Sequence, residues 1–372
     1  MKWMVGALTL ALVAGCDDAG SDAQGDAALG GAGGMAGAGG VGGAGGVGGA
    51  GGVGGMAGAG GAGGVGGAGG MAGAGGGAGG AGGQAPVDVL AGPPVADPPA
   101  GLDADTGIDP TRSADCDARY QWVAGIRGYI IDAAGAPVAR AKAQACIYTE
   151  PGTQLLCLQP ADSDADGLFT IAVTPEARCN SGINMRVLLP SAGSASMYCD
   201  TDNSEAIVRL REPLVLFPTT PARVIPPYAP GDEARDVIFP DGTALLGLVP
   251  NDYFGSDYEA MGMRRIDPAA RGLCFLGAET PAPAGVIAFY PEGDLAAPIG
   301  VRVPNDLGLA AGASVVFSVL GSLDCTLPDG GHVAEAEWED IGTGTVTADG
   351  AFIESDAGTG LPCINWMGYR PM

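Results

Sequence analysis

The feature that most constrains this chain is a glycine-rich stretch near its start. About half of the 69 glycines in the 372 residues lie between Gly30 and Gly83, a stretch built from Gly, Ala, Val and Met alone. Glycine loses more backbone freedom on ordering than any other residue and brings no side chain to bury. A collagen triple helix is excluded because Gly does not recur at every third position and Pro is absent from the repeat. We therefore expect a flexible coil here, and a folded part that begins near residue 115.

The first sixteen residues have the layout of an export signal. Lys2 gives a positive start, Val5 to Val13 is an apolar run too short to remain as a membrane span, and Val13-Ala14-Gly15-Cys16 follows. This segment resembles the signal peptide and lipobox of bacterial lipoproteins. The resemblance implies removal of residues 1–15, a diacylglycerol on Cys16, and lipid anchoring in the bacterial cell envelope, for which we expect the outer membrane or cell surface.

Two alternatives to this interpretation stay open. Asp17, directly after Cys16, resembles an inner-membrane retention signal of enteric bacteria, so the choice of membrane is not decided. An ordinary secretory signal peptide that happens to contain a Cys is the other possibility. In the lipoprotein interpretation, residues 16–114 form a tether whose Gly/Ala-rich part is followed by a stiffer Pro-containing part at Pro93-Pro94 and Pro98-Pro99.

The charge of the chain argues against nucleic acid as a partner. The 42 acidic residues exceed the 17 basic ones by 25, and only Arg264-Arg265 places two basic residues side by side. Binding to phosphates requires clustered Lys and Arg that displace counterions. We therefore expect a membrane partner through the lipid anchor and an extracellular protein or glycan as ligand.

The cysteines predict disulfides. Eight remain after Cys16, an even number in an exported chain, and no C-x2-C pair suggests zinc. A turn at Pro151-Gly152 would place Cys146 opposite Cys157 in a hairpin. A bridge between Cys179 and Cys199 is a second expectation, and Cys116 with a C-terminal partner is a third. The C-terminal candidates are Cys274, Cys325 and Cys363.

From Trp122 onward, short β-type runs are cut by turn residues every eight to twelve positions, which is typical of all-β folds. We expect two β-sandwich-like modules after a disordered Gly-rich linker, over residues 115–217 and 218–372. The first resembles the carboxypeptidase regulatory-like, transthyretin-like β-sandwich, which implies a structural or binding module without catalytic residues. The positions that carry this likeness are Gly128, Asp132, Gly135, Pro137, Val138, Asp166-Gly167 and Phe169.

The second module has Pro-Asn and Asp-Gly turns between its expected strands, as at Pro304-Asn305 and Asp349-Gly350. Over about residues 285–372 it resembles a β-rich module of large secreted bacterial surface proteins. The β-branched run Val315 to Leu320 predicts a strand buried on both faces, with a short helix as the alternative.

One acidic segment has the opening of a calcium-binding loop. Asp162, Asp164, Asp166 and Gly167 fit D-x-D-x-D-G, but Val173 stands where an EF-hand needs a bidentate Glu. We favour a plain turn and keep calcium as the alternative.

Catalysis has one candidate region. Asp252, Asp257 and Glu259 could act as acid and base on a glycoside, with Tyr253 and Tyr258 as stacking rings. An exposed loop anchored to a sheet by its aromatic rings is the interpretation we favour.

Three other residues have possible functional roles. The only histidine, His332, follows Asp329-Gly330-Gly331 and is expected in an exposed turn. Trp338 and Trp366 are expected in the core rather than as sugar platforms. We accordingly expect a non-enzymatic surface lipoprotein that binds a protein or glycan. A carbohydrate-active hydrolase and a stalk subunit of a larger assembly are the alternatives.

Overall fold

The computed structural model describes residues 88–149, 155–188, 193–201, 204–226, 233–255, 257–276, 282–322 and 325–372. The signal peptide, Cys16 and the glycine-rich repeat lie outside these residues, so those assignments remain predictions. The predicted all-β class is confirmed, since the helical elements in the described part are short 3-10 turns. Within these residues no helix is both long enough and apolar enough to cross a bilayer.

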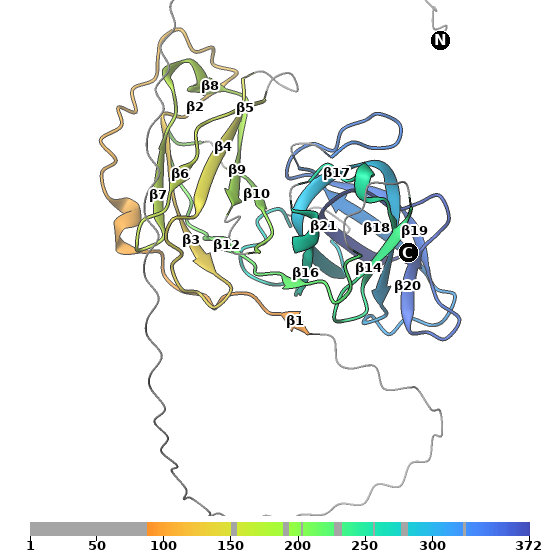
Figure 1. Cartoon of the computed structure of the whole chain (residues 1–372). Helices are drawn as coiled ribbons and strands as arrows, with labels where there is room; N and C mark the ends of the chain where they lie inside the picture. Colours follow the sequence, from red (N-terminus) through yellow and green to blue (C-terminus); the bar gives the residue numbers. More distant parts are fainter. Residues whose placement is uncertain are drawn as a thin grey trace, which may run out of the picture. The chain divides into compact units, whose positions relative to one another are not determined.

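The first module consists of two main sheets (Figure 1). In one sheet, β3 (Gly125–Asp132) pairs with β7 (Leu168–Ala172), β11 (Ile207–Arg209) and β12 (Leu214–Leu216). The other contains β4 (Lys142–Tyr148), β5 (Leu155–Cys157), β6 (Ala161–Asp162), β9 (Gly182–Leu188) and β10 (Met197–Asp200). A small additional ladder joins β2 (Gln121–Trp122) to β8 (Cys179–Asn180).

Glycine and turn chemistry set the register of this module. Gly128 pairs with Phe169 across β3 and β7, and a Cβ at Gly128 would lie 2.6 Å from the Phe169 ring. The ring therefore occupies space that any larger residue at position 128 would take. Before β7, Gly167 adopts a φ of +75°, which glycine tolerates best, so the chain turns sharply into the strand.

The second module is built around one long strand, β17 (Gly285–Pro304). Its main sheet runs from β17 through β21 (Leu361–Pro371), β18 (Ser314–Leu320), β19 (Trp338–Val346) and β20 (Phe352–Ser355), and β20 pairs with β17 again. The strands thus close into a barrel, a feature that the strand pattern did not specify. Flanking strands are β1 (Val89–Leu90), β13 (Thr220–Pro221), β14 (Arg235–Ile238), β15 (Ala244–Leu248) and β16 (Gly262–Ile266). The strand predicted at Val315 to Leu320 is present as β18.

The two modules share a hydrophobic core. Phe217 from the end of the first module packs edge-on against Trp366 of β21, with ring centroids 5.9 Å apart. The Trp366 indole is fully buried, and its Nε1–H donates to the Ser196 carbonyl at 2.6 Å. Leu273 and Phe275 belong to the same buried cluster as the inner residues of the sandwich. The boundary near residue 217 therefore marks a change of module but not the edge of a separate core.

The segment 88–114 differs from the tether that the sequence predicted there. β1 pairs in parallel with β16, and Leu102 of η1 (Ala100–Asp103) is fully buried in the shared core. Arg127 Nε donates to the Gly101 carbonyl at 2.9 Å, which fixes this turn against the first module. Residues 88–114 are therefore part of the folded head, and Leu90 and Leu102 pack against its hydrophobic core.

Four disulfides occur among the described residues. The bridge between Cys146 and Cys157 across the β4–β5 hairpin agrees with the prediction. Two predicted pairings are wrong: Cys179 does not bond to Cys199, and Cys116 does not bond to a C-terminal cysteine. Cys116 bonds to Cys179, and Cys199 bonds to Cys274. The β2–β8 ladder explains the first correction, because it places Trp122 opposite Cys179 and so brings the N-terminal arm to this edge. The remaining bridge joins Cys325 to Cys363.

Candidate functional site

The acidic and aromatic segment around residue 255 turns its tyrosines inward. Tyr253 and Tyr258 lie in the core of the second module, with ring centroids 6.3 Å apart. Tyr253 Oη donates to the Pro291 carbonyl at 3.0 Å, and burial raises the pKa of Tyr253 well above its usual range. The two rings therefore anchor a loop, as the favoured interpretation predicts, and do not form an exposed stacking surface. Phe254 between them is largely exposed.

The carboxylates of this segment lie on its outer side. Asp252 is half-buried at the end of η4 (Pro250–Asp252), whereas Asp257 and Glu259 are exposed. Asp257 adopts a left-handed backbone with φ of 59°, directly before η5 (Tyr258–Ala260). Tyr253 and Tyr258, the rings expected to stack on a sugar beside these carboxylates, are buried in the core of the second module.

The aspartates of the calcium-like motif have structural partners. Asp164 Oδ1 accepts hydrogen bonds from the backbone amides of Asp166 and Leu168, each at 2.9 Å. Asp162 lies in β6 and forms an ion pair with Lys142 at 2.5 Å. These contacts support the plain turn that we favoured.

His332 is exposed, in an isolated bridge with Thr326. Trp338 is half-buried and packs near Phe275, with ring centroids 5.8 Å apart, whereas Trp366 is fully buried. Both tryptophans therefore contribute to the core, as expected.

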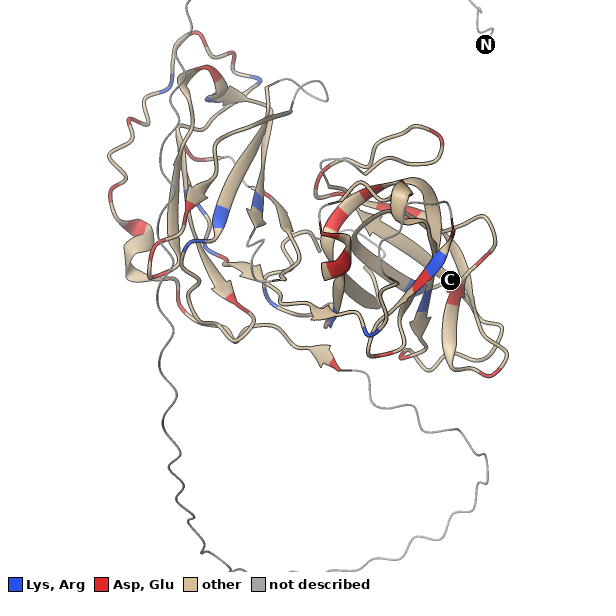
Figure 2. Cartoon of the chain, in the orientation of Figure 1, with Lys and Arg blue, Asp and Glu red and all other residues tan. Residues whose placement is uncertain are grey.

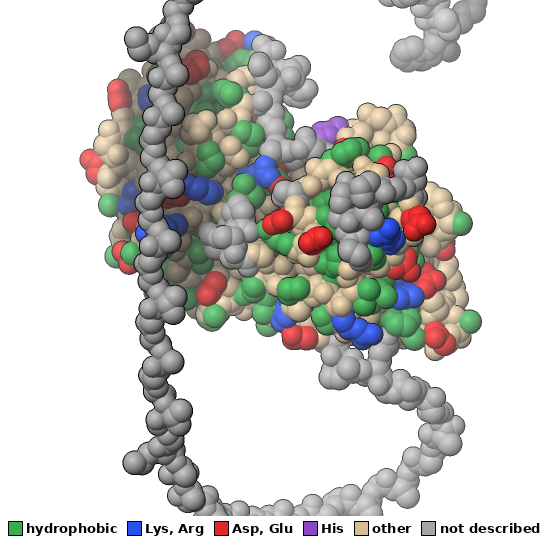
Figure 3. All heavy atoms as spheres, in the orientation of Figure 1, with side chains coloured by type: hydrophobic (Ala, Val, Ile, Leu, Met, Phe, Trp, Pro, Cys, Tyr) green, Lys and Arg blue, Asp and Glu red, His purple; other side chains and the backbone are tan. Residues whose placement is uncertain are grey.

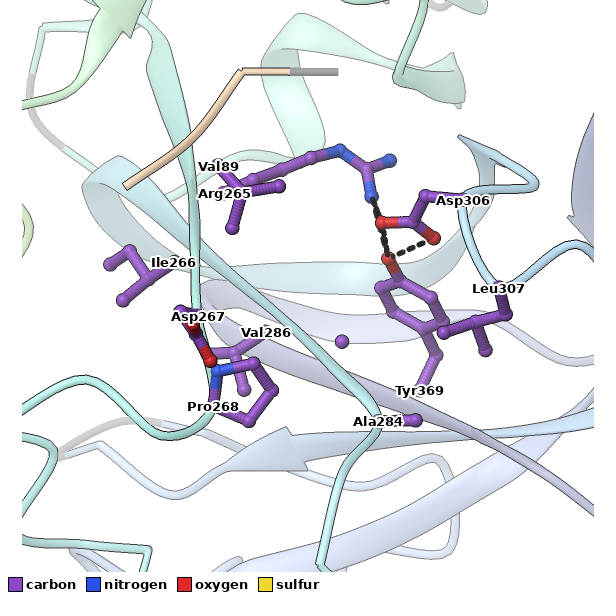
Figure 4. A pocket seen from close by; sticks show the side chains of 11 residues that line it. Val89, Arg265, Ile266, Asp267, Pro268, Ala284, Val286, Asp306, Leu307 and Tyr369 are labelled. Carbon is purple, nitrogen blue, oxygen red and sulfur yellow. Dashed lines mark hydrogen bonds and ion pairs between the residues drawn. The ribbon is translucent and has the colours of Figure 1, made fainter. Parts of the chain in front are cut away.

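Arg265 on β16 is a buried charged residue of the second module, 3% exposed. Its Nε donates to Asp241 at 2.7 Å, while Nη1 donates to Asp306 at 2.8 Å and to Tyr369 Oη at 2.6 Å. Nη2 donates to Thr243 Oγ1 at 3.2 Å. Figure 4 shows the Arg265 side chain directed toward Asp306 and Tyr369, at one end of a pocket of about 540 Å³.

Local sequence makes this cluster possible. Gly285 lies opposite Tyr369 in the β17–β21 register, and a Cβ at Gly285 would overlap the tyrosine ring. Burial acts to lower the pKa of Arg265, but Tyr369, Asp306 and Asp241 outweigh it, so the pKa is raised. For the tyrosine, burial acts in the opposite direction and raises the pKa of Tyr369 well above its usual range. With all its nitrogens bonded to protein groups, Arg265 has a structural role.

A second hollow, of about 590 Å³, lies over neighbouring strands and is rich in arginine. We call it the arginine hollow. Its lining comes from β1, β13, β14, β16, β17 and β20 and the segments beside them. The residues are Asp88, Thr220, Arg223, Ile238, Phe239, Pro240, Asp241, Gly242, Met263, Arg264, Arg265, Arg302 and Phe352.

The arginines of this hollow are less completely engaged than Arg265. Arg264 pairs with Asp88 at 2.9 Å, and Arg302 lies 3.7 Å from Glu354, beyond hydrogen-bond distance. Arg223 is exposed and makes no side-chain hydrogen bond or ion pair within the described ranges. Figure 2 shows how few blue segments the chain has, and in Figure 3 Lys and Arg side chains gather along the lower edge of the face in view.

A third polar cluster lies where the two modules meet. Arg186 of β9 and Tyr198 of β10 both bond to Glu292 of β17, and Asn184 Nδ2 donates to the Glu335 carbonyl at 3.0 Å. The Glu335 side chain is buried, and its oxygens accept no hydrogen bond from any described residue. Burial, opposed by Arg186 and reinforced by Asp200, raises the pKa of Glu335 to about 7.

Sequence reasoning missed all three of these polar clusters. The pair Arg264-Arg265 was the one available signal, because adjacent residues on a strand point to opposite faces. That alternation sends Arg265 inward and leaves Arg264 beside the hollow. The partners Asp306, Asp241 and Glu292 come from distant segments that only the fold brings together. No family model and no curated protein matches the chain.

Proposed function

We propose that this protein is a lipid-anchored protein of the bacterial cell envelope whose β head is a binding module rather than an enzyme. The lipobox at Cys16 supports the anchor, and the glycine-rich segment supports a flexible connection between lipid and head. The likeness of residues 120–217 to carboxypeptidase regulatory-like sandwiches supports a binding or structural role.

The observation that carries the binding role is the arginine hollow. In a chain with a net charge of −25, three arginines that are not saturated by protein partners face one depression of ligand size. Pockets of some 300 to 1,000 Å³ with a few convergent polar groups are typical of ligand sites. The hollow therefore gives the head a specific place to bind.

The covalent framework supports placement outside the reducing cytoplasm. Four disulfides brace the described part, and the bridge from Cys199 to Cys274 links the two modules. Bridges of this kind persist in oxidising compartments and are rare in the cytosol. A hydrolase that uses Asp252, Asp257 or Glu259 is the weaker proposal, because the tyrosines that would hold a sugar ring beside them point into the core.

The anchor is tested by replacing the lipidation residue. Cys16→Ser should move the protein from the membrane fraction to the soluble or uncleaved pool, because no thiol remains to carry lipid. Gly15→Ala is the matched control, since it keeps a small residue before Cys16 and should leave the protein in the membrane fraction. Protease treatment of intact cells then distinguishes surface display from a periplasmic location. A Cys16→Ser protein that is cleaved like wild type and still stays in the membrane fraction would refute the lipid anchor.

A further inference from the structure

We propose that the arginine hollow binds the carboxylate of an acidic saccharide, a polymer of uronic acid type. This inference rests on the proposed binding role of the head and names the ligand class for one site. It is carried by the charge of the hollow, the free donors of its arginines, and the apolar surface beside them.

The local charge of the hollow opposes that of the whole chain. Four arginines line the hollow, Arg223, Arg264, Arg265 and Arg302, against two carboxylates, Asp88 and Asp241, so the lining has a net charge of +2. The other carboxylate partners, Asp306 of Arg265 and Glu354 of Arg302, lie outside that lining. A hollow with an excess of positive charge on an acidic protein favours an anion locally while the rest of the surface repels it.

Arg302 is held ready for a planar anion. Its guanidinium carbon lies 5.0 Å from the centroid of the Phe352 ring, and this stacking restrains the side chain. Its Nε–H is buried and has no acceptor among the described residues, and the same is true of Arg264. A ligand would therefore reach each guanidinium through the exposed part of its side chain, 29% for Arg302 and 21% for Arg264. A guanidinium supported on its face still offers the N–H groups at its edge, and these match the two oxygens of a carboxylate.

Beside the arginines, the hollow offers apolar surface. Exposed Pro240 and half-buried Ile238 and Phe352 provide this surface, while Phe239 and Met263 beneath them are almost completely buried. An inorganic phosphate ion has no apolar part that could pack against this surface. A sugar ring has an apolar C–H face as well as polar edges, so a carboxylated ring can use both parts of the hollow together.

Asp88 gives the hollow a competing carboxylate of its own. Its side chain is largely exposed, yet it forms an ion pair with Arg264 at 2.9 Å at the point where the described chain begins. A ligand carboxylate that binds Arg264 must displace or share this partner. Removal of the Asp88 charge should therefore strengthen binding, whereas removal of an arginine should weaken it.

The experiment measures binding of the purified full chain to oligogalacturonate of four units by calorimetry at low salt. Neutral cello-oligosaccharide of equal length, inorganic phosphate and an acidic glutamate peptide are the comparison ligands. We expect binding of the oligogalacturonate that weakens with salt, and no comparable binding of the other three. Comparable affinity for the acidic peptide or for phosphate would overturn the saccharide assignment.

Variants then locate the site. Arg302→Ala should lower the affinity for oligogalacturonate about tenfold. Arg302→Lys should lower it less, because lysine keeps the positive charge but cannot donate two parallel hydrogen bonds to one carboxylate. Asp88→Asn should raise the affinity about threefold. Arg119→Ala is the matched control, because Arg119 is an exposed arginine of the first module. Thermal unfolding of each variant shows whether it is folded.

The outcomes separate this inference from the proposed function. If the head binds oligogalacturonate but Arg302→Ala and Asp88→Asn do not change affinity, the site is elsewhere and only the inference fails. If cleaved Cys16→Ser protein stays in the membrane while the hollow variants behave as expected, the anchor fails and the site stands. If no acidic saccharide binds the folded protein, the ligand class is wrong.

Discussion

Arg265 and Arg302 are the same residue type in the same module, and they are used in opposite ways. Arg265 has a side chain 2% exposed and donates to four side chains, Asp241, Thr243, Asp306 and Tyr369. Arg302 is 29% exposed, stacks on Phe352, and has a single distant carboxylate, Glu354. In our binding proposal, the number of partners already present therefore distinguishes a candidate ligand contact from a structural arginine.

The physical reason is the cost of burying charge. A buried guanidinium is tolerated only when carboxylates and hydrogen bonds replace the water it has lost. Arg265 meets that condition within the protein, so a ligand would add nothing to it. Arg302 keeps contact with water and has donor capacity that the protein does not use.

The largest effect on stability is expected at Arg265, whose nitrogens all have partners within the protein. Arg265→Ala should lower the free energy of unfolding by about 3 to 5 kcal/mol, because it leaves Asp241 and Asp306 without their cation. Chemical denaturation at neutral pH measures the loss. A loss below about 1 kcal/mol would erase the contrast between the two arginines.

A second variant tells lost ion pairing from lost packing at that site. Asp306→Asn in the Arg265→Ala background removes one of the unpaired charges and should recover part of the stability. If the double variant is as unstable as the sum of the single variants, the cluster does not act as a unit.

The next effect concerns Glu335, a buried charge-bearing group that lacks the partners Arg265 has. Because its pKa is raised from 4.5 to about 7, the folded protein holds a proton that the unfolded chain releases. The free energy of unfolding should therefore fall as pH rises from about 4.5 to 7. Glu335→Gln lacks this titration, so its stability relative to wild type should increase by about 2 kcal/mol across that window.

Urea denaturation of wild type and Glu335→Gln at several pH values between 4 and 8 measures this difference. Glu259→Gln is the control, since Glu259 is exposed and its replacement should leave the pH dependence unchanged. Parallel pH profiles for wild type and Glu335→Gln would show that Glu335 finds partners in solution.

A smaller effect on stability is expected at Arg302, which has few partners within the protein. Arg302→Ala should lower the free energy of unfolding by about 1 kcal/mol or less, the size of an exposed cation–π contact. Thermal unfolding checks this. A loss as large as that of Arg265→Ala would make Arg302 a structural residue and remove it from the binding proposal.

The smallest effect is expected at Arg223. Its exposed side chain makes no ion pair with any residue the structure describes, so Arg223→Ala should change stability by no more than about 0.5 kcal/mol. The affinity of the Arg223→Ala protein for an acidic saccharide should still fall, because the variant lacks a positive charge beside the hollow. No change in affinity would restrict the site to Arg264 and Arg302.

Local features of this fold could be predicted from the sequence, and long-range ones could not. Pro151-Gly152 between two cysteines was enough to predict the bridge from Cys146 to Cys157, because both lie in one hairpin. The bridge from Cys199 to Cys274 depends on how two modules pack, and no local pattern records that.

The same distinction applies to the candidate site. For Tyr253 and Tyr258, the sequence left two interpretations open, and the favoured one, a loop anchored by its rings, agrees with their burial in the core. Arg264 on β16 and Arg302 near the end of β17 line the same hollow although they come from separate parts of the sequence, and no local pattern records that. Arg265 could not be identified as saturated, since its carboxylate partners lie in two other segments.

The central claim is that this head is exported, oxidised and held by lipid. Intact-mass analysis of the mature protein, extracted from membranes and alkylated without reductant, tests it most directly. We predict a chain that starts at Cys16, carries the added mass of acyl-glycerol on that residue, and has no alkylated thiol. A mature chain with an unmodified amino terminus, or one in which the eight later cysteines are alkylated, would contradict the account.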